Sequence, residues 1–418
     1  MAEVVIVGGG IIGLCTAFYA SQAGHRVTVI DRNPEQRDGC SYGNAGMIVP
    51  SHFVPLAAPG MVALGLKWMW NPESPFYIKP RLNADLIAWA YRFWRAATPG
   101  HVERAAPILR DLSLASRRAY EELAALPDLD FGLVRKGLLM LCKTQHALDD
   151  EARGATRARA LGIPADILDA RQTAALDPDV TMDILGSVYY PRDCHLSPDR
   201  LMAALQRRLQ AAGVRWLWNT EVTGWTTEAG RIRAVRTQGA GEEITAEEFV
   251  LAGGSWSMGI GNGLELHLPM QAGKGYSLTL PEPRQLPRLC SIFTEARMAI
   301  TPMGETLRFG GTMEIAGLNE DINPVRVRGI VKSVPKYFPE FELEDFENIR
   351  PWRGLRPCSP DGMPYLGRPA RFRNLVVATG HAMMGLSLGP VTGQLVTELL
   401  AGKPPSIPLD LLNPDRFA

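Results

Sequence analysis

The chain has 418 residues, more than one domain usually holds, so we expect two closely connected domains. Hydrophobic residues make up 46% of it, which is ordinary for a protein with a large buried core. Lysine plus arginine and aspartate plus glutamate number 44 each, and this balance argues against a nucleic acid partner.

The six cysteines are scattered, without a CxxC pair and without a Cys/His spacing suited to zinc. Scattered thiols in a long chain are typical of a reducing compartment, so we expect a cytoplasmic protein without a disulfide framework or a metal site. The first residues lack a basic segment followed by an apolar one, so we expect no signal peptide.

The N-terminal residues predict a strand, a helix and a second strand. Residues 3–8 form a continuous apolar run, typical of a strand buried on both faces of a parallel sheet. Residues 11–23 carry apolar side chains at helical spacing and are followed by Gly24, and residues 26–31 form the next strand.

The middle of the chain alternates between predicted helices and short strands. Helical spacing covers residues 83–97, 105–125 and 149–161, and Ser197 followed by Pro198 predicts a helix start. Strands are expected at residues 136–143, 185–190, 215–217, 221–227, 232–237 and 249–252, and antiparallel strands between 275 and 312. A buried strand at 375–378 and a helix at 389–400 end the pattern.

Residues 8–13 (GGGIIG) fit the GxGxxG pattern between the first strand and the first helix. Gly8 permits a tight turn, Gly10 lets the backbone approach a pyrophosphate, and Gly13 lets the helix pack closely on the strand. Phosphates then lie at the helix N-terminus, where free N–H groups and the helix dipole favour anions. Asp31 ends the second strand, where a carboxylate can bind a ribose.

This unit predicts a dinucleotide site; the alternative is a glycine turn with only a packing role. The residues that we assign to it are Gly8, Gly10, Ile11, Ile12, Gly13, Asp31 and Arg32. The pattern by itself does not distinguish FAD from NAD.

Three later segments carry more specific motifs. The first is SYGNAGM at 41–47 with PLAAPG at 55–60, and the second is VLAGGSWS at 250–257. The third comprises WRGLRP at 352–357, SPDG at 359–362 and ATGHAMMGLSLGP at 378–390. Over nearly its whole length the chain resembles the D-amino-acid oxidase/glycine oxidase superfamily, and within it the bacterial D-amino-acid dehydrogenases.

The resemblance implies an FAD site, with the helix N-terminus after residue 388 next to the reduced flavin's negative charge. The further residues that it assigns to FAD are Ser41, Asn44, Ala45, Gly46, Met47, Val222, Gly253, Gly254, Trp256, Gly380, His381, Met383, Met384, Gly385, Leu386 and Ser387. Two alternatives stay open, a generic surface loop at 41–47 and a plain core valine at 222.

The resemblance and the apolar strands together predict an α/β fold, with a discontinuous, doubly wound (Rossmann-like) FAD-binding domain. We assign residues 1–50, 191–265 and 346–418 to that domain. Residues 51–190 and 266–345 then form an α+β substrate domain with a mixed or antiparallel sheet.

Arg356 is the expected substrate anchor, because the arginine of GLRP binds the amino acid's carboxylate in the glycine-oxidase branch and a guanidinium fork suits a carboxylate. The alternative is a structural salt bridge, for which Arg353 is the better candidate. The sarcosine-oxidase branch ties its flavin to a cysteine where this chain has Gly354, and Cys358 is four places away, so we expect non-covalent FAD.

A tyrosine of the glycine-oxidase branch is missing from residues 298–301 (MAIT). Tyr276, in GKGYSLT at 273–279, is a candidate to replace its contact with the carboxylate; otherwise it is a strand tyrosine with its hydroxyl in water. His52 and His195 are expected to border the pocket, and we include His52 among the catalytic candidates although a lone histidine is more often structural.

The resemblance implies oxidative deamination of a D-amino acid, with hydride passing from Cα to flavin N5 and electrons passing on to a quinone or another carrier. The residues expected around the substrate are apolar or uncharged, which favours a neutral side chain or a ring such as D-proline or 4-hydroxy-D-proline. Three alternatives remain: a glycine/sarcosine-type amine oxidase using oxygen, a 2-hydroxy-acid dehydrogenase, and a flavin-binding protein without turnover.

Three prolines interrupt the most apolar stretch, 45–70, so it does not predict a spanning helix of about 20 apolar residues. The aromatic residues in 61–70 and 86–94 have two explanations. They rest on a membrane surface, which would make the protein peripheral at the inner face of the cell membrane, or they cover the active site and pack in a core.

Overall fold

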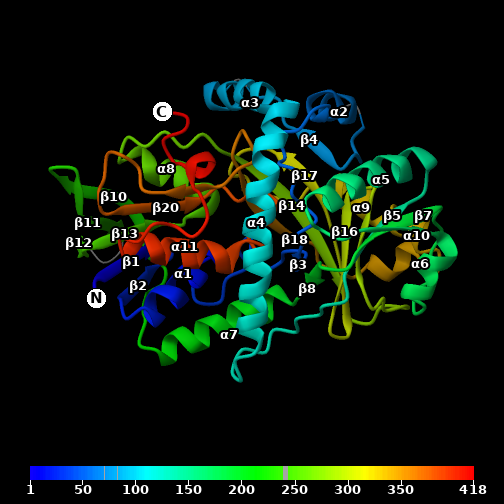
Figure 1. The fold of residues 1–418 in the computed structure, drawn as a ribbon, viewed down its shortest axis with the longest axis horizontal. Coiled ribbons are helices and arrows are strands. Elements are labelled where there is room, and N and C mark those ends of the chain that lie inside the picture. The colour runs from blue at the N-terminus through cyan, green and yellow to red at the C-terminus, as the bar shows by residue number, and fades with distance from the viewer. Residues whose placement is uncertain (70, 82, 239–242) are drawn as a thin grey trace.

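A computed structural model describes residues 1–69, 71–81, 83–238 and 243–418 (Figure 1). Trp70, which ends the aromatic segment 61–70, lies outside the described residues. The elements fall into a half built on a parallel sheet and a half built on a larger mixed sheet, and the long helix α4 (Pro99–Ala124) runs between them.

The parallel sheet has six strands in the order β19-β20-β13-β1-β2-β9, and every neighbouring pair is parallel except β19 with β20. Its strands are β1 (Glu3–Val7), β2 (Arg26–Ile30), β9 (Arg215–Leu217), β13 (Glu248–Leu251), β19 (Tyr365–Gly367) and β20 (Leu375–Thr379).

Both faces of this sheet are covered, which explains the continuous apolar runs in its sequence. Val4 and Ile6 point into the core under the helices α1 (Ile11–Gln22) and α11 (Gly389–Leu400), which pack against each other. Val5 and Val7 point the other way, into a core with residues of a three-stranded antiparallel sheet. That sheet consists of β10 (Glu221–Glu228), β11 (Arg231–Gln238) and β12 (Glu243–Thr245), and helix α8 (Ser257–Asn262) lies beside it.

The mixed sheet has nine strands in the order β18-β14-β17-β16-β15-β5-β7-β6, with β4 beside β17. Only β15 with β5 and β17 with β4 are parallel. Its strands are β4 (Phe76–Ile78), β5 (Leu138–Cys142), β6 (Asp166–Asp169), β7 (Gly186–Tyr190), β14 (Gln271–Leu280), β15 (Cys290–Phe293), β16 (Met298–Met303), β17 (Thr306–Ile315) and β18 (Trp352–Cys358).

The two faces of the mixed sheet contact different parts of the molecule. One face, with Tyr276 and Phe309, packs on the helices α9 (Pro324–Val331) and α10 (Val334–Tyr337). The other, with Leu138 and Met140, belongs to the core shared with α1 and α11. The remaining helices are α2 (Met61–Trp68), α3 (Ala84–Ala96), α5 (Gln145–Ala160), α6 (Ala170–Leu176) and α7 (Pro198–Ala211), and β3 (Met47–Ile48) pairs with β8 (Cys194–His195).

The structure confirms the α/β class and most predicted elements, but two helices begin earlier than expected. Helix α4 begins at Pro99 and α5 at Gln145, because Thr98 and Thr144 accept backbone N–H groups of His101 and Ala147 as N-caps. The prediction followed apolar spacing alone and missed these caps. At the predicted start of α7, Ser197 occupies the N-cap position but its side chain forms no capping hydrogen bond.

The parallel sheet takes its strands from segments 1–50, 191–265 and 346–418, although β18 of the third segment pairs with β14 in the mixed sheet. The division of the chain into two domains at these boundaries stays a prediction. Within the described residues, no helix is both long enough and apolar enough to cross a membrane.

Candidate active site

The GxGxxG turn joins β1 to α1 in a conformation that only glycine tolerates. Gly8 has a φ of 113°, and a Cβ there would lie 2.4 Å from the carbonyl oxygen of Ala252 on the neighbouring strand. A Cβ at Gly13 would lie 1.9 Å from the carbonyl oxygen of Gly8. These contacts let α1 begin immediately above the sheet, so its N-terminal N–H groups open toward the cavity described next.

A cavity of about 430 Å³ extends from this turn, past the loop 39–44, to β18 and the turn after β20. Its size is in the usual range for cofactor sites. The predicted cofactor residues that line it are Gly8, Gly10, Ile11, Ile12, Asp31, Arg32, Ser41, Asn44, Val222, Gly253, Gly254, Trp256, His381, Gly385 and Leu386. The predicted residues that do not line it are Gly13, Ala45, Gly46, Met47, Gly380, Met383, Met384 and Ser387.

Asp31 lies at the end of the cavity near β2 and is 9% exposed. One carboxylate oxygen accepts the backbone N–H of Gly9 at 2.7 Å, and the other accepts the backbone N–H of Asn33 at 2.8 Å. The second oxygen also accepts the side-chain N–H of Asn33 at 3.0 Å, so only the oxygen bonded to Gly9 keeps a free lone pair for the expected ribose contact.

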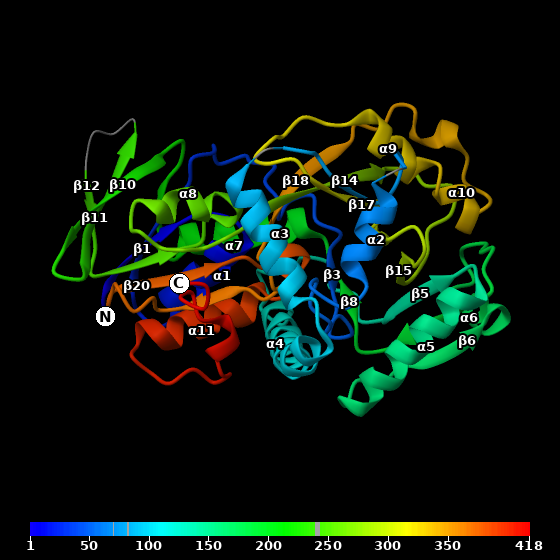
Figure 2. The same cartoon turned by 90° about the horizontal axis from the view of Figure 1, so that it is seen from above.

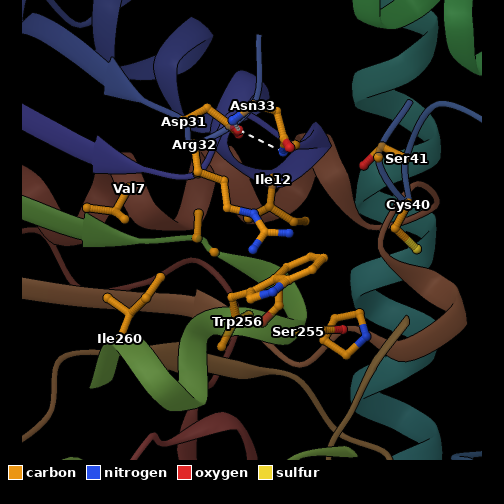
Figure 3. A pocket seen from close by; sticks show the side chains of 18 of the residues that line it. Val7, Ile12, Asp31, Arg32, Asn33, Cys40, Ser41, Ser255, Trp256 and Ile260 are labelled. Atoms are coloured by element: carbon orange, nitrogen blue, oxygen red, sulfur yellow. Dashed lines mark hydrogen bonds between the residues drawn. The ribbon is translucent and has the colours of Figure 1, made fainter. Parts of the chain in front are cut away.

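Arg32 and Trp256 approach each other across the cavity from different segments (Figure 3). The Arg32 guanidinium carbon lies 3.8 Å from the centre of the Trp256 ring, in a cation–π contact. Sequence analysis missed a similar pair at the glycine turn, where Arg37 lies over Trp218 and donates to the carbonyl of Gly9.

The loop 41–46 is held between the cavity and the mixed sheet. Ser41 Oγ accepts the N–H of Ile11 at the start of α1, at 3.1 Å. On the sheet side, Ser277 donates to the carbonyl of Gly43 at 3.1 Å and Arg308 donates to that of Asn44 at 2.8 Å. Burial lowers the pKa of Arg308. The loop is therefore a fixed wall of the site and not a free surface loop.

The turn after β20 closes the far end of the cavity. His381 is 3% exposed, with Nε2 3.0 Å from Thr392 Oγ1 of α11, and burial lowers its pKa to about 3. The ring is therefore neutral at physiological pH. Ser387 Oγ accepts the N–H of Val49 at 3.1 Å, which joins this turn to the segment that carries His52.

Arg356 lies on β18 between Leu355 and Pro357, which both line the cavity. Its guanidinium extends over Gly275 of β14, where a Cβ would lie 2.2 Å from Nη2, so only glycine leaves room for it. Nη1 donates to the carbonyl of Thr312 at 2.7 Å. Thr312 has a φ of 67° next to a bulge in the β14–β17 pairing, and this turns its carbonyl out of the ladder.

The two arginines of the WRGLRP motif have different partners. Arg353 pairs with Asp38 at 2.6 Å and with Glu320 at 3.4 Å. Arg356 forms no ion pair with any described residue, and most of its donors are free. Arg353 therefore has the structural role, and Arg356 is available to bind an anion.

Tyr276 does not reach the cavity, which corrects the expectation that it contacts the substrate. Neighbouring residues on a strand point to opposite faces, so Tyr276 points away from the face on which Arg356 covers Gly275. It is 1% exposed in the core under α9, and its hydroxyl donates to Glu314 Oε2 at 2.6 Å. Burial and that carboxylate raise its pKa.

The two histidines differ in their surroundings, and neither lines the cavity. His195 is 1% exposed within the β3–β8 pair, and burial lowers its pKa to about 4. His52 is partly exposed and bonds to Ser51, which in turn bonds to the buried Asp193. Sequence analysis missed Ser51 and Asp193, because no local pattern joins residues so far apart in the chain.

A family model described as FAD dependent oxidoreductase (DAO) matches residues 3–399 of the chain. The chain belongs to this family. It is 30% identical to the D-amino acid dehydrogenase of Bradyrhizobium diazoefficiens, with 100% of this chain and 99% of that protein covered. It is 33% identical to the D-amino acid dehydrogenase of Methylobacterium nodulans, with 99% of both covered.

Two solved structures have the same fold as this chain. Glycine oxidase from Geobacillus kaustophilus superimposes with a TM-score of 0.78 at 26% identity, covering 100% of this chain and 99% of that one. L-proline dehydrogenase from P. horikoshii superimposes with a TM-score of 0.75 at 18% identity, covering 100% and 97%.

As a DAO-family oxidoreductase, the protein uses FAD. Its cavity fits that cofactor: the glycine turn admits a pyrophosphate, α1 presents its N-terminus, and Leu355 and Pro357 of β18 line the far end.

Proposed function

We propose that this enzyme oxidises the amine of a neutral D-amino acid, or of a cyclic D-imino acid such as D-proline or 4-hydroxy-D-proline. The product would be an imino acid, which water hydrolyses to a 2-oxo acid unless it is a stable cyclic imine. The observation that carries the proposal is Arg356, an arginine without an ion-pair partner among the described residues, between Leu355 and Pro357, which line the far end of the FAD cavity. The names of the relatives support the substrate class.

Arg356 would bind the substrate's carboxylate through the N–H groups of its guanidinium that Thr312 leaves free. This contact would fix the direction in which the Cα–H bond of the substrate points. The carbonyl of Thr312 holds the guanidinium in place before the substrate arrives. FAD, when bound, supplies a two-electron acceptor for the Cα hydride. The chain's own contribution is orientation, so losing Arg356 should weaken binding and turnover together.

The cofactor would be held without a covalent bond. Gly354 offers no side chain, and Cys358 is fully buried with its Sγ 3.5 Å from the carbonyl of Arg356. Burial raises the pKa of the Cys358 thiol to about 12, so it is not a ready nucleophile. Denaturing the yellow protein in acid should release all of its flavin.

The decisive experiment is an anaerobic screen in which the flavin absorbance of the holoenzyme is followed after adding D- and L-amino acids, sarcosine or 2-hydroxy acids. Bleaching by neutral D-amino or D-imino acids alone supports the proposal. Arg356→Ala should lower kcat/KM by about 10²- to 10⁴-fold, as expected when a charged contact to the substrate is removed.

The matched control is Arg353→Ala on the same strand, which should lower stability and leave the substrate preference unchanged. Bleaching by glycine or sarcosine with stoichiometric hydrogen peroxide in air would favour the oxidase alternative. Bleaching by hydroxy acids alone would favour the 2-hydroxy-acid dehydrogenase alternative. A flavin that no compound bleaches would favour a flavin-binding protein without turnover.

The second part of the proposal concerns the electron acceptor, which we place in or on a lipid bilayer as a quinone. Helix α3 buries Leu86 and Trp89, whose Nε1 donates to the carbonyl of Cys358 at 2.9 Å. Its opposite face presents Ile87, Tyr91 and Trp94 at 61%, 55% and 60% exposure.

These three side chains follow helical spacing and therefore form one apolar stripe on the surface. Figure 1 shows α2 at the same edge of the molecule as α3. The exposed cations Lys67 and Arg95 lie on these two helices, so the edge suits an anionic bilayer. The protein would then be cytoplasmic and peripheral at the membrane.

Co-sedimentation with anionic and neutral vesicles tests this contact. The wild type should bind anionic vesicles, and Tyr91→Ser with Trp94→Ser should reduce that binding about tenfold or more. A matched control is Leu343→Ser, which removes an exposed apolar residue elsewhere. Equal sedimentation of all three proteins would disprove a membrane contact through α3.

A further inference from the structure

Three polar side chains form a continuous hydrogen-bonded chain beside the cavity. Ser51 Oγ donates to Asp193 Oδ2 at 2.5 Å, and the N–H of Ser51 donates to Asp193 Oδ1 at 3.1 Å. Ser51 Oγ also lies 3.0 Å from His52 Nδ1. The chain leads from a fully buried carboxyl group, 0% exposed, to a partly exposed imidazole.

Neither His52 nor Arg356 lines the cavity, but the segment that carries His52 and the strand that carries Arg356 meet at the turn after β20, which closes the cavity. The segment with His52 is tied to the turn after β20 on both sides: Val49 donates to Ser387, and Leu56 packs in one cluster with Ala382. Ala382 lines the cavity, and its turn contacts β18, the strand of Arg356.

The carboxyl and the imidazole have unusual acidities. Burial raises the pKa of Asp193 to about 7, and no described residue forms an ion pair with it. Burial, together with the positive charge of Arg297 in the β15–β16 turn, lowers the pKa of His52 to about 4. The other titratable groups facing Asp193 are Arg117 of α4, Tyr190 of β7, Cys194 of β8 and Cys290 of β15.

At neutral pH the ring of His52 is therefore uncharged and does not keep an extra proton, whereas Asp193 is ready to accept one. When Asp193 is ionised, Ser51 donates to it and accepts from Nδ1–H of His52, which leaves Nε2 with a free lone pair. When Asp193 is protonated, the direction of both bonds reverses and Nε2 carries the hydrogen.

We propose that His52, Ser51 and Asp193 form a relay that removes the proton from a bound ammonium substrate. This inference rests on the proposed function, because an amino acid arrives mostly as the ammonium form and must be neutral for its Cα hydride to depart. His52 would be a catalytic residue, and Ser51 and Asp193 would be positioning residues.

The relay moves one proton and no electrons. An N–H bond of the substrate breaks as its proton passes to Nε2 of His52. The Nδ1 proton passes to Ser51 Oγ, and the Ser51 hydroxyl proton passes to Asp193 Oδ2. Overall, the substrate's ammonium becomes a neutral amine and the Asp193 carboxylate becomes a neutral carboxyl group. His52 changes to its other tautomer.

The first test needs no substrate. In holoenzyme with ¹⁵N-labelled histidine, the ring nitrogens of His52 are followed from about pH 5 to about pH 8, with His52→Gln identifying the signals. The dominant tautomer should change from Nε2–H to Nδ1–H as the pH rises through about 7. Asp193→Asn should abolish the change, and an unchanged wild-type tautomer over this range would overturn the relay.

The second test follows the anaerobic reduction of FAD by the best amine substrate as a function of pH. Ser51→Ala should slow reduction by about 10²-fold and move the pH profile toward the pKa of the substrate's own ammonium. Ser51→Thr, which keeps the hydroxyl, should recover most of the rate. Ser113→Ala is the matched control, because Ser113 is fully buried and its hydroxyl has no partner among the described residues.

A Ser51→Ala enzyme with the wild-type rate and pH profile would overturn the relay while leaving the proposed function intact. If no amine bleached the FAD, the proposed function would fail together with the relay's role in proton release. The tautomer change in the first test would then identify a hydrogen-bonded chain without that role.

Discussion

Individual side chains in this enzyme take their roles from the face of the strand on which they lie. Arg356 and Tyr276 belong to neighbouring strands of one sheet, yet the Arg356 guanidinium lies over Gly275 on one face and Tyr276 lies in the core on the other face. Their motifs, GLRP and KGYS, suggested similar roles. The alternation of side chains along a strand gave them different ones.

Tyr276→Phe tests the structural assignment of Tyr276. The change leaves Glu314 without the hydroxyl and the backbone N–H of Asn323 without an acceptor, so it should lower the free energy of unfolding by about 1–3 kcal/mol. Because the ring lies away from the cavity, kcat/KM should change less than about twofold.

Tyr337→Phe provides the control, since Tyr337 lies in the same core and its hydroxyl also donates to a carboxylate, that of Glu295, at 2.5 Å. Denaturant unfolding and steady-state kinetics of the two variants should agree. A loss of kcat/KM confined to Tyr276→Phe would return Tyr276 to the substrate site.

His381 links stability to pH. Its pKa in the folded protein, about 3, lies below the ordinary value of 6.5, so the folded state favours the neutral ring. The neutral His381 ring therefore adds fully to the free energy of unfolding above about pH 6.5, and this stability is lost as the pH falls toward 3. The loss in the free energy of unfolding is about 2 kcal/mol by pH 5.

His381→Gln should therefore lose less stability than the wild type between pH 7 and pH 5, by about 2 kcal/mol. The comparison cancels the opposite contribution of Asp193, whose raised pKa makes the folded protein less stable as the pH rises from about 4 to about 7. The same loss of stability in both proteins between pH 7 and pH 5 would show that folding does not lower the pKa of His381.

At the scale of elements, α1 depends on its close approach to β1. Gly13→Ala places a Cβ 1.9 Å from the carbonyl of Gly8, so either the helix moves away from the sheet or the turn deforms. Both outcomes move the N–H groups that would bind the pyrophosphate. We expect purified Gly13→Ala to retain less than about a tenth of the wild-type FAD.

Gly100→Ala is the matched control, because it also introduces a methyl group in the first turn of a helix, with 3.7 Å to the nearest side-chain atom of Arg104. The ratio of flavin to protein absorbance measures both variants. Full FAD content in Gly13→Ala would mean that the turn tolerates the methyl group.

At the scale of the whole molecule, Arg416 ties the C-terminal residues to the segment that follows β18. Its guanidinium donates to Asp361 at 2.8 and 3.1 Å and to the carbonyl of Met363 at 2.7 Å, and it stacks on Tyr365. The pair is only 12% exposed on each side, so breaking it leaves a poorly solvated carboxylate.

Arg416→Ala should therefore lower the free energy of unfolding by about 3 kcal/mol, measured by denaturant unfolding. Asp361→Asn combined with Arg416→Ala should cost less than Arg416→Ala alone, because no charge remains unpaired. Equal losses in the two variants would show that water already solvates Asp361 and that the ion pair contributes little.

The hydrogen-bonded chain of His52, Ser51 and Asp193 also depends on the tertiary structure of the whole molecule. Asp193 precedes β8, and Ser51 follows β3, so the pairing of β3 with β8 brings the two residues together. Figure 2 shows β3 and β8 side by side near the middle of the molecule, between its two halves. The buried carboxyl group thus lies where the two sheets meet.

The sequence by itself determined the family, the α/β class and the FAD cofactor. GxGxxG, Asp31 and the C-terminal block are local patterns whose geometry follows from short-range sterics and hydrogen bonding. It also predicted the ion-paired role of Arg353, whereas the role of Arg356 as substrate anchor stays a prediction.

Only the tertiary structure decided which face Tyr276 occupies, that α3 both packs and exposes an apolar stripe, and that Asp193 meets Ser51 and His52. The bulge beside Tyr276 and the register of β14 are set by pairing with distant strands, and the acidity of Asp193 is set by burial. Burial and long-range pairing depend on the whole chain, and so no local pattern encodes them.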